Sequence, residues 1–235
     1  GVLEATSLEA KYGNTKGEQG TLKLGFKGEG SPFQLDIQVD ADLSEVPPVL
    51  KRLVTHRAFL SELEKTREVH GRARGKLVLG EQLSDIRVRV EVDQFDLSGG
   101  YQGIPYPVKL QGGRYFYEGT SSHGRELHCR VGKSSVSGLS FHVEWEREPR
   151  MTVELRQGKI SVEEIFSWMS SVEAFQGDLK GVRSLGGEVL LREARVSGPL
   201  LDPAQWSFEV YGQIPDLHGR VDSLPGGSER AVSDH

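Results

Sequence analysis

The acidic side chains are the first candidates for chemistry, because positioned carboxylates carry out much acid–base catalysis. Asp93 and Asp96 are separated by two residues, and Glu144, Glu146 and Glu148 recur at every second position. All five fall on the polar side of expected strands or in turns, where an ionised side chain stays hydrated. The sequence therefore predicts a solvated outer face at these positions and no catalytic residue, and we expect the chain not to be an enzyme.

Histidine and cysteine give no pattern typical of a metal or thiol site. His128 and Cys129 are adjacent, so in a strand they point to opposite faces and cannot share one ion. Cys129 is the only cysteine, which excludes an internal disulfide, and it lies on the apolar side of a strand, as a small buried hydrophobe would. His142 is out of phase with Phe141 and Val143 and is expected to be solvated. No metal and no cofactor is predicted.

Glycine-rich segments could bind phosphate, but their context favours turns. The pairs at 99–100, 112–113 and 186–187 are not followed by Lys-Ser or Lys-Thr entering a helix. Gly132-Lys133-Ser134 resembles the end of a phosphate loop, yet the upstream glycine is missing and expected strands lie on both sides. We interpret all of these segments as connections between strands.

Composition restricts the possible classes. The 235 residues carry a net charge of −5, with 36% hydrophobic and 27% charged side chains and 29 glycines. This composition is typical of a folded, turn-rich β chain, and it lacks the basic stripe that nucleic-acid binding requires. No apolar run reaches the roughly 18 residues of a membrane span. Because the chain begins at Gly1 without Met or a signal peptide, we expect a fragment of a longer protein, with any anchoring segment outside it.

The elements that position these residues are mainly strands. Three segments open with Gly-x-apolar-x-apolar, at 20–24, 75–79 and 187–191, and longer alternating strands follow at 33–39, 86–92 and 206–210. Period-two alternation gives each strand one apolar and one polar side. Hairpins are expected from 108–110 to 114–117, from 127–131 to 135–136, and from 141–145 to 151–155.

Two amphipathic helices interrupt the strands. The first is expected over 46–66, with Asp42 or Ser44 as its cap and an apolar stripe that we expect to plug or border an open sheet. The second is expected near 162–171, where Ser161 and Glu164 have the spacing of a capping box.

The sequence thus predicts a mainly β fold: a long curved antiparallel sheet of stacked hairpin repeats with two short amphipathic helices. We expect one domain over 1–225, with repeat-like units of about 1–70, 71–185 and 186–225, and a disordered tail at 226–235. Two helices cannot cover roughly a dozen strands, since one helix covers about 10 Å of sheet. Either the sheet closes on itself or an apolar face stays open for a ligand.

One stretch resembles a known family. It runs from Gly132-Lys133-Ser134-Ser135 through the alternating strand 141–145 and the strand 149–155 to Gly158–Met169, where a strand passes into a short helix. The segments 47–53 and 71–77 fit the same pattern, so about 43–215 resembles bacterial AsmA-like proteins, with their TamB and YhdP relatives. These motifs are packing patterns and contain no catalytic signature.

The resemblance implies a repeating β-groove of a bridge-like lipid-transfer protein. Such a protein lies in the periplasm of a Gram-negative bacterium and is anchored to the inner membrane through a segment absent here. Its groove shields phospholipid or other acyl chains on their way to the outer membrane, and it supports outer-membrane homeostasis. The family's N-terminal membrane helix is missing from this sequence, which leaves the position of this segment in a longer groove open.

A lipid groove needs apolar residues on one strand side, because acyl chains are held by non-directional burial. The predicted groove-facing residues are Leu22, Leu24, Leu35, Ile37, Val39, Val88, Val90, Val92, Phe141, Val143, Trp145, Val153 and Leu155. The alternative is a non-enzymatic β-sandwich scaffold or adhesion module, in which the same residues form a closed core. A hydrolytic β domain would need carboxylates that converge in a cleft.

Overall fold

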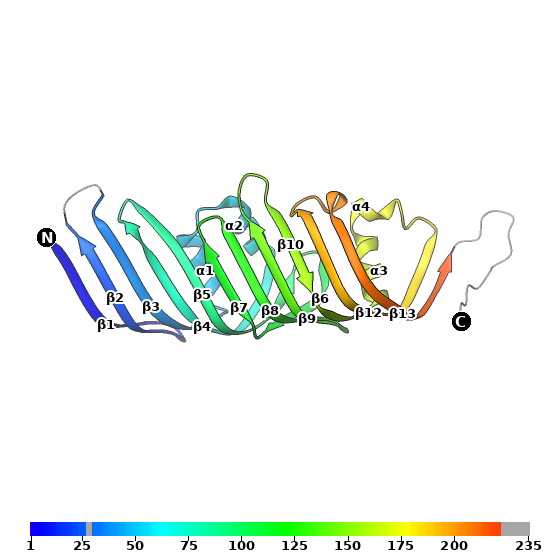
Figure 1. The fold of residues 1–235 in the computed structure, drawn as a ribbon, viewed down its shortest axis with the longest axis horizontal. Coiled ribbons are helices and arrows are strands. Elements are labelled where there is room, and N and C mark those ends of the chain that lie inside the picture. Colours follow the sequence, from blue (N-terminus) through cyan, green and yellow to red (C-terminus); the bar gives the residue numbers. More distant parts are fainter. Residues whose placement is uncertain (27–29, 222–235) are drawn as a thin grey trace.

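One long antiparallel sheet makes up most of the computed structural model, which describes residues 1–26 and 30–221. The predicted disordered tail at 226–235 lies outside the described residues. Figure 1 shows the strands side by side along the long axis, with β1 and β13 at opposite ends. The strands are β1 (Val2–Tyr12), β2 (Thr15–Gly25), β3 (Pro32–Asp42), β4 (Thr66–Gln82), β5 (Asp85–Tyr101), β6 (Ile104–Gln111), β7 (Arg114–Glu118), β8 (Ser121–Val131), β9 (Ser134–Glu144), β10 (Arg150–Leu155), β11 (Gln157–Ser161), β12 (Val182–Pro199) and β13 (Ser207–Val221). The predicted mainly β fold is confirmed.

Neighbours in sequence are mostly neighbours in the sheet, and all strand pairings between described residues are antiparallel. The hairpins expected from β8 to β9 and from β9 to β10 are confirmed. The hairpin expected from 108–110 to 114–117 is wrong. β6 and β7 instead lie end to end between β5 and β8, each pairing with both. Gly112 donates its N–H to Phe95 O (2.9 Å), so the glycine pair carries the chain onward along β5 instead of reversing it.

The register places apolar side chains on one face of the sheet. Leu35 lies opposite Leu79, and Leu79 lies opposite Val88. Directly opposed residues in an antiparallel pair share a face, so this row and those beside it form a continuous apolar surface. The apolar residues that alternate along each strand therefore lie on the same face in neighbouring strands of the sheet.

Four α-helices and a short 3-10 helix accompany the described strands: α1 (Val46–Leu53), α2 (Arg57–Glu64), α3 (Val162–Ser171), α4 (Glu173–Gln176) and η1 (Pro203–Gln205). The second predicted helix is confirmed as α3. The single helix predicted over 46–66 is wrong, because the chain breaks into α1 and α2. Val54 ends α1 with an extended backbone and is buried, and His56 is also extended before α2. The break allows both short helices to lay apolar side chains on the sheet.

The caps predicted for the helices are also wrong, since neither helix start receives a side-chain cap hydrogen bond. Glu45 precedes α1 and instead reaches the turn between β1 and β2. Its carboxylate accepts from Asn14 N (2.9 Å), Thr15 N (3.1 Å) and Thr15 Oγ1 (2.7 Å). Thr15 Oγ1 in turn accepts from Asp42 N (3.1 Å). The hydrogen bond from Asn14 N, followed by that from the Thr15 hydroxyl, lowers the pKa of Glu45.

Glu164 makes the same set of bonds in the second half of the chain. Its carboxylate accepts from Lys133 N (2.7 Å), Ser134 N (3.2 Å) and Ser134 Oγ (2.8 Å), at the turn between β8 and β9. Ser134 Oγ accepts from Ser161 N (3.1 Å). Ser161 and Glu164 therefore do not cap each other, and the glutamate ties the start of α3 to a hairpin. We call each of these two arrangements a turn latch.

The two turn latches belong to a structural duplication with a spacing of 119 residues. Gly13 and Gly132, which open the two latched turns, both have φ +57°. Ser7 and Glu126 are non-glycine residues with φ 58° and 55°, and they too are 119 positions apart. The bounds of β1 and β2 match those of β8 and β9 at the same spacing. Such agreement in backbone irregularities indicates that the chain builds the same unit twice.

A matching backbone irregularity occurs in the two longest hairpins, at a spacing of 116 residues instead of 119. Gly71 of β4 and Gly187 of β12 have φ 121° and 122°. A Cβ atom on either glycine would lie 1.9 Å from a backbone oxygen of the next strand, that of Asp96 or of Asp216. Only glycine fits both the torsion and the close approach. The boundaries of the repeat-like units predicted from the sequence stay a prediction. The repeated backbone torsions show similar geometry, and they do not test whether each unit folds independently.

Candidate functional site

The apolar face carries the predicted groove residues. One row crosses the middle of the sheet through Val39, Val92, Phe141 and Val153, with Gly75, Tyr115 and Gly124 at the intervening strands. A second row contains Ile37, Val90 and Val143. Leu22, Leu24, Leu35, Val88 and Leu155 lie in neighbouring rows of the same face. The structure thus brings the predicted strand residues together, and whether they hold lipid stays a prediction.

Trp145 is the one predicted groove residue outside a strand. It follows the last residue of β9, and its backbone N–H donates to Thr120 O (2.6 Å). Its indole Nε1 donates to Ser122 Oγ (2.6 Å), and the residue is 8% exposed. Burial of an indole is favourable when its N–H has such a partner. Trp145 is therefore a fixed part of the packed apolar cluster.

Helices α1 and α2 cover the middle of the apolar face. Val54 between them is buried against Val88, Tyr117, Val143 and Trp145, which come from β5, β7, β9 and the end of β9. Around this core pack Leu50, Leu53, Ala58, Phe59, Leu60, Leu77, Leu79, Val90, Tyr115, Phe141, Met151 and Leu200. We call α1, α2 and the residues joining them the roof. Figure 1 shows the roof on one side of the sheet, as expected for the predicted amphipathic stripe.

Polar contacts hold one end of the roof. Glu62 of α2 accepts a hydrogen bond from the Tyr101 hydroxyl and forms an ion pair with Lys65 (2.5 Å). Thr66 Oγ1 donates to Leu63 O (2.6 Å) where β4 begins. Burial, followed by the bond to Glu62, raises the pKa of Tyr101, so the phenol stays protonated and able to donate. These bonds fix the α2 end of the roof against β4 and β5.

The apolar face extends beyond the roof on both sides. On β1, Leu3 is paired with Leu24 and is 46% exposed. On β13, Phe208 pairs with Val196 and is 54% exposed, and the whole strand is exposed. The roof covers the centre and α3 packs against β12, so exposed apolar side chains remain on the outermost strands β1 and β13.

The sequence analysis did not predict a pair of histidines on β8 and β9. His123 and His142 lie opposite each other, with their Nδ1 atoms 2.9 Å apart, and His142 Nε2 lies 3.2 Å from Glu144 Oε1. Burial, followed by the nearby charge of His142, lowers the pKa of His123. The expectation that His142 is solvated is therefore incomplete. The pair could be predicted only from the alignment of β8 with β9. The alternation of residues within one strand does not determine that alignment.

Cys129 is half-buried and not fully buried as expected, and burial raises the pKa of its thiol. A raised pKa disfavours the thiolate, which is the nucleophile. Among residues 1–26 and 30–221, no three metal-binding side chains gather into a cluster. Of the acidic residues considered for acid–base chemistry, Asp93 and Asp96 lie in β5, Glu144 ends β9, and Glu146 and Glu148 lie in the bend that follows it. No catalytic arrangement is formed by these residues.

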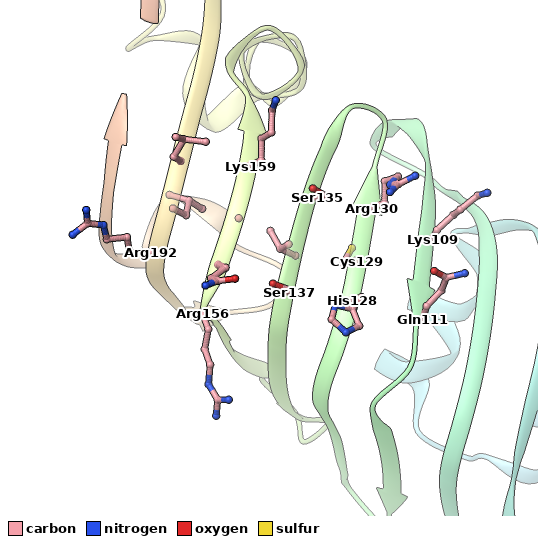
Figure 2. A pocket seen from close by; sticks show the side chains of 15 residues that line it. Lys109, Gln111, His128, Cys129, Arg130, Ser135, Ser137, Arg156, Lys159 and Arg192 are labelled. Atoms are coloured by element: carbon pink, nitrogen blue, oxygen red, sulfur yellow. The ribbon is translucent and has the colours of Figure 1, made fainter. Parts of the chain in front are cut away.

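The second site that sequence reasoning missed is a hollow of about 740 Å³ across β6, β8, β9, β11 and β12. Five cationic side chains line it: Lys109, Arg130, Arg156, Lys159 and Arg192. Figure 2 shows these side chains arriving from separate strands, with Ser135 and Ser137 between them. The cations are far apart in sequence, so no local motif reveals them. We call this site the basic hollow.

Within the described part of the chain, no helix has the length and apolarity to cross a bilayer. Comparison of the chain with known protein families, with curated proteins and with solved structures finds no match.

Proposed function

We propose that this chain shields lipid acyl chains on the apolar face of its sheet. As a segment of an AsmA-like protein, it would contribute to phospholipid transport between the inner and outer membranes and to outer-membrane homeostasis. The observation that carries this proposal is the continuity of the apolar rows beneath and beyond the roof. The chemistry required is burial and not catalysis.

Acyl chains suit a surface of this kind. Each methylene removed from water gains about 0.8 kcal/mol, without demanding a particular geometry. The rows of Leu, Ile, Val and Phe offer such burial over the width of many strands. In the described residues, no buried side-chain nitrogen or oxygen lacks a hydrogen-bond partner. A lipid on this face would therefore meet no unsatisfied buried side-chain group.

The rival reading is a β-sandwich scaffold or adhesion module with a closed core. It requires a second sheet packed on the apolar face. The described strands belong to a single sheet, and helices instead of strands cover its centre. The single sheet therefore gives the lipid proposal better support than the sandwich.

The cellular setting is part of the same proposal. An AsmA-like segment would act in the periplasm of a Gram-negative bacterium, attached to the inner membrane through a part of the protein outside this sequence. Its ligand would be a phospholipid or another acyl lipid, and no nucleic acid is involved.

Native mass spectrometry of the purified chain tests the proposal. We expect co-purified phospholipid, and Leu35→Asp should reduce it strongly, because Leu35 lies on the apolar face between Leu22 and Leu79. Gln34→Asp is the matched control, since this neighbour is exposed on the other face. Circular dichroism melting should show that both variants fold. A lipid-free wild-type chain, or equal lipid loss in the two folded variants, would overturn the proposal.

A further inference from the structure

We propose that the basic hollow binds a ligand carrying two or more phosphate groups. The cationic side chains of the hollow lie on the outer face of the sheet, because Lys109 alternates with the half-buried Val108 and Leu110 and lies opposite Arg130. They are therefore separate from the apolar face that would hold acyl chains. The hollow's volume of about 740 Å³ lies within the range of small-ligand sites, about 300–1,000 Å³.

The duplication supplies an internal comparison for this site. A hollow of about 360 Å³ occurs on β1 and β2, lined by Thr6, Ser7, Glu9, Glu18, Gln19 and Thr21. Its position overlaps in part with that of the basic hollow, since Glu9 and Glu18 stand 119 residues before His128 and Ser137. The other four lining residues have no equivalent in the lining of the basic hollow. Shifts in strand register occur beside both hollows, so the fold itself creates them.

The two hollows differ in charge although they share a backbone. Glutamates occupy the first, whereas cations dominate the second. Lys11 keeps a cation at the position equivalent to Arg130, whereas Asp40 stands in the place of Lys159, so the fold does not require every one of these cations. A chain with a net charge of −5 has nevertheless gathered five cations there. A negatively charged ligand accounts for that concentration.

Most of these cations are available to a ligand. Within the described residues, Lys109, Arg130 and Arg192 form no ion pair. Arg156 pairs with Glu126 (3.0 Å) and Lys159 with Glu188 (2.7 Å), in both cases with well-exposed side chains. Exposed pairs of this kind are weak, and a doubly charged phosphate can compete for the cation.

The spacing of the cations indicates more than one anionic group. Lys109 lies opposite Arg130, Arg130 opposite Ser135, and Ser135 opposite Lys159, so the four form one row across neighbouring strands. Strands are about 4.8 Å apart, which separates Lys109 from Lys159 by about 14 Å at the backbone. Two phosphates with a polar linker can contact both ends of this row without requiring the two lysine side chains to converge, and the Ser135 hydroxyl can donate between them.

Titration calorimetry with inorganic tripolyphosphate, and flotation with vesicles, test the site in the full chain. The vesicles are phosphatidylcholine with or without cardiolipin, whose headgroup carries two phosphates. We expect binding to tripolyphosphate, to cardiolipin vesicles, or to both. Binding to tripolyphosphate alone assigns a soluble ligand, and binding to cardiolipin vesicles alone assigns a lipid headgroup.

Arg130→Glu should weaken binding about tenfold or more, as expected when a charge-assisted contact becomes repulsive. Lys11→Glu is the matched control, because Lys11 occupies the equivalent place on β1 and the change in net charge is the same. Lys109→Glu serves as a second test at the end of the row. Failure of the wild-type chain to bind either probe would overturn the proposal, as would equal weakening by Lys11→Glu and Arg130→Glu.

Discussion

Phe59 of α2 stands edge-on to Trp145, with ring centroids 5.2 Å apart and ring planes at 84°. The same phenyl ring lies 5.4 Å from Tyr117 on β7. Edge-to-face aromatic pairs add about 0.5–1.5 kcal/mol to simple burial. Phe59 therefore fastens the roof to the sheet at the point where Trp145 is itself held by Ser122.

Phe59→Ala should loosen the roof and lower the free energy of unfolding by about 2–3 kcal/mol, less than for a fully buried phenylalanine. Trp145 would meet more water, so tryptophan emission should shift to longer wavelength. Phe26→Ala is the control, because Phe26 is 63% exposed and its loss should change stability by less than about 0.5 kcal/mol. Equal effects in urea denaturation would show that the roof is not fastened through Phe59.

Adjacent residues on β5 should respond oppositely to charge. Val90 faces the roof cluster, so Val90→Asp buries a carboxylate without a partner and should cost about 3 kcal/mol or more. Arg89 lies on the other face and bonds to Glu118, with both side chains nearly half exposed. Arg89→Glu should cost only about 1 kcal/mol from the lost pair. Comparable destabilisation of the two variants in thermal melts would contradict the assignment of faces.

The turn latch at Glu164 gives a third prediction. Glu164 is 8% exposed and accepts three hydrogen bonds, so Glu164→Ala leaves the donors of Lys133 and Ser134 without a partner. We expect a loss of about 2–3 kcal/mol in the free energy of unfolding. Glu163→Ala is the neighbouring control, because Glu163 makes only an exposed contact with Lys133 (3.6 Å). Hydrogen exchange at the Ser134 amide should rise in the first variant and stay unchanged in the second.

The fold class followed from the sequence because strand alternation is a local property. Leu35, Ile37 and Val39 show one apolar side whatever their neighbours are, and the sheet keeps that side on one face. The failed predictions all depended on long-range contacts. Glu164 has capping-box spacing, yet a hairpin 30 residues upstream competes for its carboxylate.

The sites missed by the sequence analysis have the same origin. The basic hollow gathers residues from Lys109 to Arg192, and the histidine pair depends on the β8–β9 register. The duplication was hidden because the two units share backbone torsions more than residue types, as Ser7 and Glu126 show. Each of these features becomes visible only when strands distant in sequence lie side by side.

The histidine pair predicts that acid weakens the fold. Burial and the charge of His142 lower the pKa of His123, so the folded state favours neutral His123. The resulting stability is present above the unfolded pKa of about 6.5, and it is lost as the pH falls through the lower folded value. When both rings are protonated, two N–H donors face each other across the 2.9 Å contact between the Nδ1 atoms.

We therefore expect the melting temperature of the chain to decrease as the pH is lowered below about 6.5. His142→Gln should flatten that fall, whereas His70→Gln, at an exposed position on β4, should not. An unchanged slope in His142→Gln would remove the pair as the cause.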